Sequence, residues 1–352
     1  MQKTPYHSYK IGTLSKGCQL CVKGSKLVLF LTGLCPRSCY YCPISDKKYK
    51  KDVTYADEWP TNNIKDIIKE AKLIDAQGAG FTGGDSLCRL QRAINYIKSL
   101  KKKFGRKFHI HLYTSFNLIN KDNLKKLYRT GLDEIRFHPD LDNNQLWGKI
   151  DLVKNYNWRI GIEIPAIPKK EKQTKKLIGY FANKIDFLNL NELEMADNKV
   201  NKLSNQGYRV KNKLSYAVKG SEGVALKLIK HISKKHPKLN VHYCTATLKD
   251  RVQLANRIKR RAKNIAKPYD ILTEEGLLYR GAVYSTKNLE KLRKKLIKKY
   301  KIPSKLIERD EKRKRLLIAP WVLGNIKDEQ LKLALVEEYP TYDCLNISTE
   351  FL

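Results

Sequence analysis

Three cysteines in one short segment constrain this chain more than any other feature. Cys35, Cys39 and Cys42 have a C-x3-C-x2-C spacing and follow an apolar run, 26–30, that is typical of a buried strand. Thiolates this close together on one loop can bind a single iron–sulfur cluster. A cluster with four irons and three cysteine ligands leaves one iron open to another ligand. The segment therefore predicts a reactive metal centre just beyond the end of a strand.

The spacing of these cysteines, with Tyr41 directly before the last one, resembles the signature of radical S-adenosylmethionine enzymes. The resemblance implies a [4Fe–4S] cluster on Cys35, Cys39 and Cys42, with S-adenosylmethionine bound to the open iron. It further implies cleavage of that cofactor to a 5′-deoxyadenosyl radical, with an electron donor such as ferredoxin or flavodoxin. A small zinc site is the alternative, but zinc usually takes four ligands in two spaced pairs. A disulfide disagrees with the odd number of cysteines and the missing secretory signal.

Strand and helix patterns alternate from 26 to 245, which predicts parallel βα units in an α/β fold. The expected strands are 26–32, 78–82, 107–113, 133–137, 158–164, 186–190 and 239–243, and the expected helices are 61–76, 86–103, 121–130, 142–154, 168–183 and 221–235. This order resembles the partial (β/α)6 barrel of the radical S-adenosylmethionine family. Functional residues of such barrels lie at the C-terminal ends of the strands.

We expect three parts: an N-terminal extension, 1–25, the core barrel, 26–248, and a small basic α+β module, 249–352. The long connection 195–220 has little periodicity and is interpreted as a flap on the substrate side. In the module the sequence predicts a hairpin around Glu275-Gly276, a helix 287–300, a strand 315–318, a helix near 327–332 and a strand near 332–338.

The second expected strand ends in Gly83-Gly84-Asp85. Adjacent glycines allow a ligand to approach the backbone closely. The family carries Gly-Gly-Glu here, so the resemblance implies a contact with the amino group of the cofactor's methionine part. Asp85 is one methylene shorter than the family's glutamate, which favours a weaker or water-mediated contact. A turn followed by a helix N-cap is the structural alternative.

Polar residues also follow the third and sixth expected strands. Thr114, Ser115 and Asn117 are candidates for holding the cofactor's ribose and carboxylate, or for capping the next helix. Asn191 and Glu192 are candidates for binding cofactor or substrate. The resemblance supplies these roles.

Two further residues draw attention by their positions. Glu163 lies inside an apolar strand, so it is expected to face inward and to be hydrogen-bonded. His138 ends the fourth strand at the barrel rim, where it suits proton transfer or a purely structural role.

A second set of cysteines consists of Cys18, Cys21 and Cys244. It resembles the set in radical S-adenosylmethionine enzymes that carry an auxiliary iron–sulfur cluster. The alternatives are a zinc site with a histidine such as His242, and thiols with no common role. Cys88 and Cys344 have no partner at ligand spacing and are interpreted as structural.

The charge is strongly positive, with 71 Lys/Arg against 35 Asp/Glu, or +36. Residues 249–315 alone carry 23 basic and 8 acidic residues. Such a field attracts polyanions, so RNA, in particular tRNA, is an expected partner. The alternative is that lysines merely solvate the helix surfaces. No apolar run is long enough for a membrane helix, and a cytoplasmic protein is expected.

These features lead to one prediction with alternatives. The prediction is a radical S-adenosylmethionine enzyme that modifies a nucleic acid such as tRNA. As a whole the chain resembles archaeal-type proteins related to the activating enzyme of pyruvate formate-lyase. Hydrogen abstraction from a glycine of a partner protein is therefore one alternative, and a small metabolite or peptide substrate is another. The non-enzymatic alternative is a zinc-stabilised RNA-binding protein.

Overall fold

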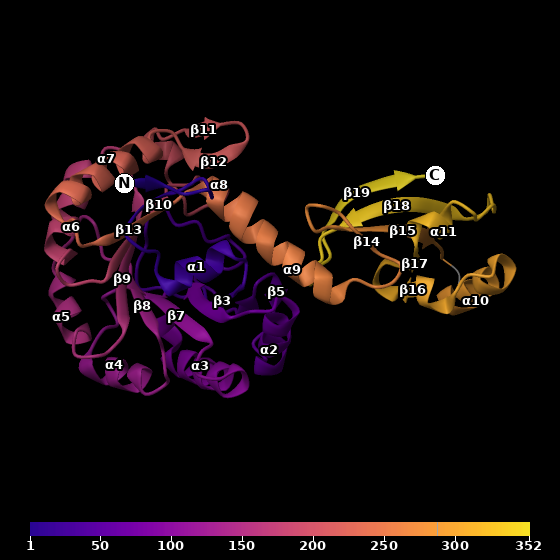
Figure 1. Ribbon diagram of the computed structural model, residues 1–352, viewed down its shortest axis with the longest axis horizontal. Coiled ribbons are helices and arrows are strands. Elements are labelled where there is room, and N and C mark those ends of the chain that lie inside the picture. Colours follow the sequence, from indigo (N-terminus) through magenta and orange to yellow (C-terminus); the bar gives the residue numbers. More distant parts are fainter. Residues whose placement is uncertain (287) are drawn as a thin grey trace. The chain divides into compact units, whose positions relative to one another are not determined.

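The computed structural model describes residues 1–286 and 288–352, and the chain divides into two compact units. The first unit comprises Met1–Lys72 and Ala76–Leu254, and the second comprises Leu73–Asp75 and Ala255–Leu352 (Figure 1). The division therefore falls near the expected boundary at 248. Residues 1–25 belong to the first unit and do not form a separate part.

Parallel strands form the centre of an eleven-stranded sheet in the first unit. In spatial order these strands are β3 (Lys26–Thr32), β6 (Gly78–Gly83), β7 (His109–Thr114), β8 (Glu134–Phe137), β9 (Arg159–Ala166), β10 (Phe187–Glu192) and β13 (Asn240–Cys244). Antiparallel strands extend both ends: β2 (Tyr9–Ile11) and β1 (Gln2–Lys3) follow β13, while β4 (Tyr55–Ala56) and β5 (Trp59–Pro60) follow β3. The expected parallel strands are confirmed with small shifts of their ends. In the described residues the sheet is an open, curved row of strands and not a closed barrel.

Helices cover the outer face of this sheet in Figure 1. They are α2 (Ile64–Leu73), α3 (Leu90–Phe104), α4 (Lys121–Tyr128), α5 (Ile150–Val153), α6 (Glu171–Phe181) and α7 (Ser221–Lys235). The rings of Phe116, Phe137 and Phe181 stack between strand and helix, with centroid distances of 4.6 and 5.7 Å from Phe116. The α-helix expected at 142–154 is much shorter, because irregular chain and a turn precede a 3-10 helix, Trp147–Lys149, that leads into α5.

Helix α1 (Lys16–Val22) lies inside the curve of the sheet (Figure 1). The Ser15 side chain caps it by accepting a hydrogen bond from the Cys18 amide at 3.3 Å. The helix thus carries two of the predicted ligands into the interior of the first unit.

The connection 195–220 contains secondary structure that the sequence did not predict, and its role as a flap stays a prediction. It contains a short hairpin of β11 (Val210–Asn212) and β12 (Ser215–Val218). The hairpin is anchored by a buried cluster of Ile167, Leu193, Leu203 and Val218. Strand β11 is exposed at every position, so it has no alternating pattern that could reveal it.

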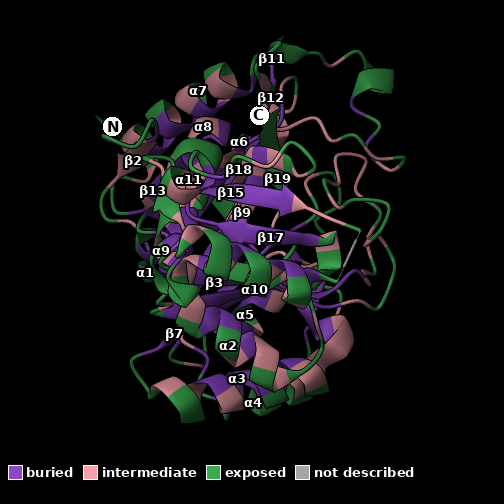
Figure 2. Cartoon of the chain, turned by 90° about the vertical axis from the view of Figure 1, so that its right-hand side faces the viewer, coloured by how far each residue is buried: buried purple, intermediate pink, exposed green. Residues whose placement is uncertain are grey.

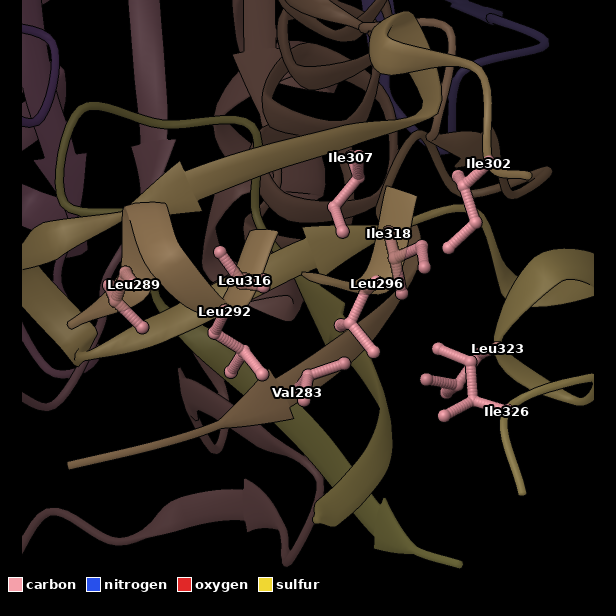
Figure 3. Packing of buried hydrophobic residues seen from close by; sticks show 10 residues of the cluster. All are labelled: Val283, Leu289, Leu292, Leu296, Ile302, Ile307, Leu316, Ile318, Leu323 and Ile326. Carbon is pink, nitrogen blue, oxygen red and sulfur yellow. The ribbon is translucent and has the colours of Figure 1, made fainter. Parts of the chain in front are cut away.

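The second unit is an antiparallel sheet with helices. Its strands pair in the order β16 (Ile307–Asp310), β17 (Arg315–Ile318), β15 (Leu278–Tyr284), β18 (Lys332–Glu338) and β19 (Asn346–Phe351), and β14 (Ile271–Leu272) also pairs with β15. The helices are α9 (Ala255–Ile265), α10 (Leu289–Tyr300) and α11 (Pro320–Leu323), while α8 (Ala246–Leu248) belongs to the first unit. Leucines of α10 pack onto apolar residues of β15 and β17 (Figure 3). Both strands are largely buried (Figure 2).

Three details of the second unit differ from expectation. The helix expected near 327–332 is wrong, because turns lead there from α11 into β18. Strands β16 and β19 were not predicted, since three of the four residues of β16 are charged and β19 is exposed along its whole length. The first residue of the helix expected at 287–300 lies outside the described residues. Within the described ranges, no helix is long and apolar enough to cross a bilayer.

Candidate active site

The cysteine loop leaves the end of β3 and is held by backbone contacts. Gly33 donates its amide to the Lys51 carbonyl at 2.8 Å and accepts from the Lys50 amide at 2.9 Å. A Cβ atom on Gly33 would lie 1.7 Å from the Lys48 carbonyl oxygen, so this position requires glycine. On the other side the Asn198 amide group donates to the Cys42 carbonyl at 3.1 Å. The loop is therefore clamped between its own return segment and the 195–220 connection.

The three loop thiols are half-buried, which affects their protonation. Burial raises the pKa of Cys35 to about 11 and also raises the pKa of Cys42. Both thiols are therefore protonated near neutral pH. Metal binding has to displace these protons, so affinity should increase with pH.

Gly83 and Gly84 pack directly against the base of the cysteine loop. Their added Cβ atoms would lie 2.3 Å from the carbonyl oxygens of Thr32 and Leu34, respectively. The Gly84 amide donates to the Thr32 carbonyl, and the Asp85 amide donates to the Leu34 carbonyl, both at 2.8 Å. The glycine pair thus sets the position of the loop as well as lining the cavity beside it.

Asp85 is buried, and its carboxylate is fully used by the protein. One oxygen accepts from the Leu87 amide at 3.0 Å and the Thr114 hydroxyl at 2.7 Å. The other accepts from the Ser115 amide at 2.9 Å and the Ser115 hydroxyl at 2.6 Å. These four donors occupy the four lone-pair positions of a carboxylate. The geometry therefore favours the structural alternative, in which Asp85 is an N-cap that also positions Thr114 and Ser115.

A cavity of about 760 Å³ joins most of the predicted site residues. Its lining includes Cys21, Cys35, Cys39, Tyr41, Cys42, Gly83, Gly84, Asp85, Thr114, Ser115, Asn191 and Glu192. Asn117 is exposed and lines a neighbouring cavity of about 600 Å³ on the other side of the cysteine loop. Cys18 and Cys244 are absent from this lining. The fold therefore brings predicted residues from five separate segments to the wall of one cavity.

His138 connects the loop to the sheet. Its Nδ1 lies 2.8 Å from the Glu163 carbonyl oxygen, which can only accept, so Nδ1 carries the proton. The other nitrogen, Nε2, then accepts from the Tyr41 hydroxyl at 3.0 Å. Burial lowers the pKa of His138 to about 4, which keeps the ring neutral at physiological pH. The Arg37 guanidinium donates to the His138 carbonyl at 2.6 Å and fixes the loop from the same side.

Glu163 faces inward and is fully hydrogen-bonded, as predicted. It accepts from Arg136 and Asn189 at 2.8 Å, from Asn191 at 3.0 Å and from the Tyr113 hydroxyl at 3.1 Å. Burial would raise the pKa of Glu163, but Arg136 and the two amides outweigh it and lower the pKa. The carboxylate is therefore charged and rigidly placed at the wall of the cavity.

Lys26, His111 and Lys249 also line the cavity and were missed by sequence reasoning. Lys26 is buried, donates to the Gly17 carbonyl at 3.1 Å and contacts His111 Nδ1. Burial lowers the pKa of Lys26 to about 8. Lys249 forms an ion pair with Glu194. The period-two alternation of β3 and β7 placed Lys26 and His111 on the inner face, and this signal could have identified them.

Glu192 and the second cysteine set are held by different contacts. Glu192 accepts a hydrogen bond from the Ala246 amide at 2.9 Å.

The thiols of the second cysteine set have shifted pKa values. Burial would raise the pKa of Cys18, but Arg136 and His242 outweigh it and lower the pKa to about 6. Burial raises the pKa of Cys244 to about 12, and the charges of Cys18 and Cys21 add to the rise. The three thiols thus lie within range of one another's charges.

The cysteine loop suits the cluster that its resemblance implies. Within the described ranges, no three Cys, His, Asp or Glu side chains converge closely enough to bind one metal ion. Thiolates of a cluster bind different irons, so they need not meet at a single point. Three thiols on one loop fit a [4Fe–4S] cluster, and the cavity beside them, with hydroxyl, amide and carboxylate groups in its wall, fits an adjacent polar cofactor.

Comparisons with known proteins agree with this site. Residues 29–163 match the model of the "Radical SAM superfamily". A protein of Methanocaldococcus jannaschii, provisionally named a glycyl-radical enzyme activating enzyme, is 38% identical over 95% of this chain and 92% of its own length. Biotin synthase of Buchnera aphidicola is 28% identical over 39% of this chain and 39% of its own length.

Two solved structures are also similar. SuiB of Streptococcus suis bound to S-adenosylmethionine has a TM-score of 0.42 and 13% identity, covering 63% of this chain and 50% of that one. Methylornithine synthase has a TM-score of 0.43 and 15% identity, covering 61% and 63%. The long match to the M. jannaschii protein and the match of residues 29–163 settle the family. The chain belongs to the radical S-adenosylmethionine superfamily, whose members use a [4Fe–4S] cluster and S-adenosylmethionine.

Proposed function

We propose that the protein is an activating enzyme that abstracts a hydrogen atom from a glycine of a partner protein. The observation that supports this proposal is the M. jannaschii relative, whose provisional name gives that activity. The similarity extends over 95% of this chain, so it includes the second unit as well as the cofactor site.

In this proposal the cavity residues hold the cofactors. Cys35, Cys39 and Cys42 bind the cluster, which together with S-adenosylmethionine supplies a 5′-deoxyadenosyl radical. The hydroxyls of Thr114 and Ser115 donate to Asp85, so their oxygens remain able to accept hydrogen bonds from a ligand. The rigid frame behind them keeps these acceptors in place and lowers the entropy cost of binding.

Further residues on the rim suit the charged parts of S-adenosylmethionine. Lys249 offers a cation for its carboxylate, and Glu194 keeps that ammonium group in position. Asn191 is oriented by its bond to Glu163 and presents its amide group at the cavity wall. Tyr41 and His138 hold the cysteine loop against β8 and β9.

A protein substrate also agrees with the surface near the loop. The hairpin of β11 and β12 exposes Leu214 (94%) and Tyr216 (65%), and the segment before it binds the cysteine loop through Asn198. Exposed apolar side chains beside a cavity favour contact with a protein surface more than with a nucleic acid.

The expected tRNA substrate has no comparable support. Residues 255–352 carry 23 basic and 13 acidic residues, whereas residues 1–254 carry 48 and 22. The net charge per residue is therefore nearly equal in the two parts, because acidic residues after 315 offset the basic run before it. The comparisons likewise give no support to a nucleic-acid target.

Isotope transfer can test the proposal. The reconstituted enzyme is mixed with S-adenosylmethionine, a reductant and RNase-treated protein from cells grown on α-deuterated glycine. Deuterium in the released 5′-deoxyadenosine is the expected result. A parallel reaction uses protein-free RNA from cells grown on deuterated nucleosides. The activase proposal is contradicted if the cofactor is cleaved but the released 5′-deoxyadenosine gains deuterium only in the RNA reaction, or in neither reaction.

A further inference from the structure

The inner side of the first unit contains a second group of sulfur ligands. Helix α1 presses against the sheet, because a Cβ atom on Gly17 would lie 2.4 Å from Arg136 Nη2 and 2.5 Å from His111 Nδ1. Cys18 and Cys21 are three residues apart on this helix and so lie on one side of it. Cys18 is buried, and Cys21 lines the deep part of the cavity described above.

Two strands complete the surroundings of Cys18. Asn189 on β10 donates to its sulfur at 3.3 Å, and Arg136 on β8 donates at 3.4 Å. Asn189 pairs with His242 and Asn191 pairs with Cys244 in the parallel register of β10 and β13. His242 and Cys244 are two residues apart, so both face the same interior as the two asparagines. Positions 18, 21 and 244 thus lie on the same inner side of the sheet, and their thiols could each bind a different iron of one cluster.

His242 provides an independent observation. Its side chain is 3% exposed, and its Nε2 lies 3.4 Å from the Ser8 hydroxyl. Its Nδ1 has no hydrogen-bond partner among the described residues. A buried imidazole nitrogen without a partner is costly, and a metal ion bound together with the neighbouring thiols would satisfy it.

We propose that Cys18, Cys21, Cys244 and His242 bind a second iron–sulfur cluster, separate from the one on the cysteine loop. Lys26, Arg136 and Lys249 lie around these thiols and offset the charge of three thiolates. Arg136, Asn189 and Gln253 (3.7 Å from Cys244 Sγ) supply the N–H donors that surround cluster sulfurs in proteins. Because Cys21 lines the cavity, the second cluster would border the space in which substrate is bound.

The test removes the ligands of the first cluster. The variant Cys35→Ala/Cys39→Ala/Cys42→Ala, purified without oxygen and reconstituted, should retain about four irons with matching sulfide per chain. It should also retain an iron–sulfur absorbance band and a reduced-state paramagnetic resonance signal. Adding Cys18→Ala or Cys244→Ala to it should remove this iron, whereas adding Cys88→Ala or Cys344→Ala should not.

A conservative variant separates ligation from folding. In the same background, His242→Cys should keep the iron but change the resonance signal, because a thiolate replaces an imidazole. Absence of iron from the background variant overturns the proposal, as does zinc in place of iron. A Cys18–Cys21 disulfide in the anaerobically purified wild type overturns it as well. None of these measurements uses a partner protein, so the second-cluster proposal can fail or hold independently of the activase proposal.

Discussion

Each unit contains a glutamate that is paired with arginine inside the fold, and the two glutamates have different surroundings. Glu163 is 14% exposed, lines the cavity and contacts Arg136, two asparagines and a tyrosine. Glu338 is 0% exposed and contacts Arg280, Arg313 and Arg315. Both are carboxylates bound to arginine, so a buried charge by itself does not identify a site. The difference lies in the neighbours: amides and a phenol at a cavity wall in one case, a closed group of arginines in the other.

The largest expected effect concerns the cysteine loop, where thiols and not a carboxylate are the proposed functional groups. Cys35→Ala removes a cluster ligand, so release of 5′-deoxyadenosine from S-adenosylmethionine should fall below detection. Liquid chromatography of anaerobic reactions measures this. Cys88→Ala, whose thiol lies within range of the Cys35 charge but outside the ligand set, should retain activity. Cleavage that survives in Cys35→Ala would mean that the cluster is assigned to the wrong residues.

Next, the two glutamates can be compared directly. Glu338→Gln leaves three arginines without their common carboxylate and should lower the free energy of unfolding of the second unit by about 3–5 kcal/mol. Glu163→Gln should cost less, about 1–3 kcal/mol, because Glu163 is partly exposed and pairs with one arginine, whereas Glu338 is fully buried and pairs with three. It should instead slow cofactor cleavage about tenfold, equivalent to about 1.4 kcal/mol. Urea titrations measure the loss of stability, and cleavage rates measure the loss of activity. If Glu338→Gln and Glu163→Gln lost the same activity, the two glutamates would not differ in function.

His138 predicts a pH dependence of stability. Its pKa is about 4 in the folded chain and about 6.5 when unfolded, so between these values the unfolded chain binds more protons. Stability from this group is complete above pH 6.5 and should be lost as pH falls toward 4, by about 3 kcal/mol. His111 contributes with the same sign. Urea titrations of wild type and His138→Asn at pH 7 and pH 5 give the loss of unfolding free energy between the two pH values. Wild type should lose more than the variant, and an equal loss in both would refute the assignment.

The smallest effect tests the glycine pair. Gly84→Ala puts a methyl group 2.3 Å from the Leu34 carbonyl, so the base of the loop must move. We expect iron affinity at the loop to fall about tenfold, a change of about 1.4 kcal/mol. Gly179 on α6 has no atom within 4 Å of an added Cβ, and Gly179→Ala should leave iron binding unchanged. Equal iron affinity in the two variants would show that the close packing does not matter.

Much of the first unit could be predicted from sequence, because its strands and helices follow simple periods and its cysteines have a recognisable spacing. The inner face could be only partly predicted. Glu163 was identified because a carboxylate is conspicuous in an apolar strand, whereas Lys26 was overlooked although the alternation of β3 places it on the inner face. Asp85 was given a cofactor contact because sequence does not reveal that Thr114 and Ser115 fill its oxygens.

The second unit was harder to predict for a physical reason. Strand β19 is exposed on both faces and has no alternation, and β16 contains three charged residues among four. Both strands are formed by pairing with β18 and β17, which is a long-range effect that no local pattern records.

The position of α1 has a consequence for how the chain folds. Ser8 and His242 are in contact although 234 residues separate them, and β2 pairs with β13 across a similar distance. Contacts between such distant residues form late, because a long loop must close first. During synthesis the first helix must therefore wait until β13 has emerged before it can be enclosed. In a nascent chain that stops before that strand, α1 should be accessible to protease and its thiols to oxidation. Addition of β13 to the sheet is therefore the step that encloses α1 and protects its cysteines.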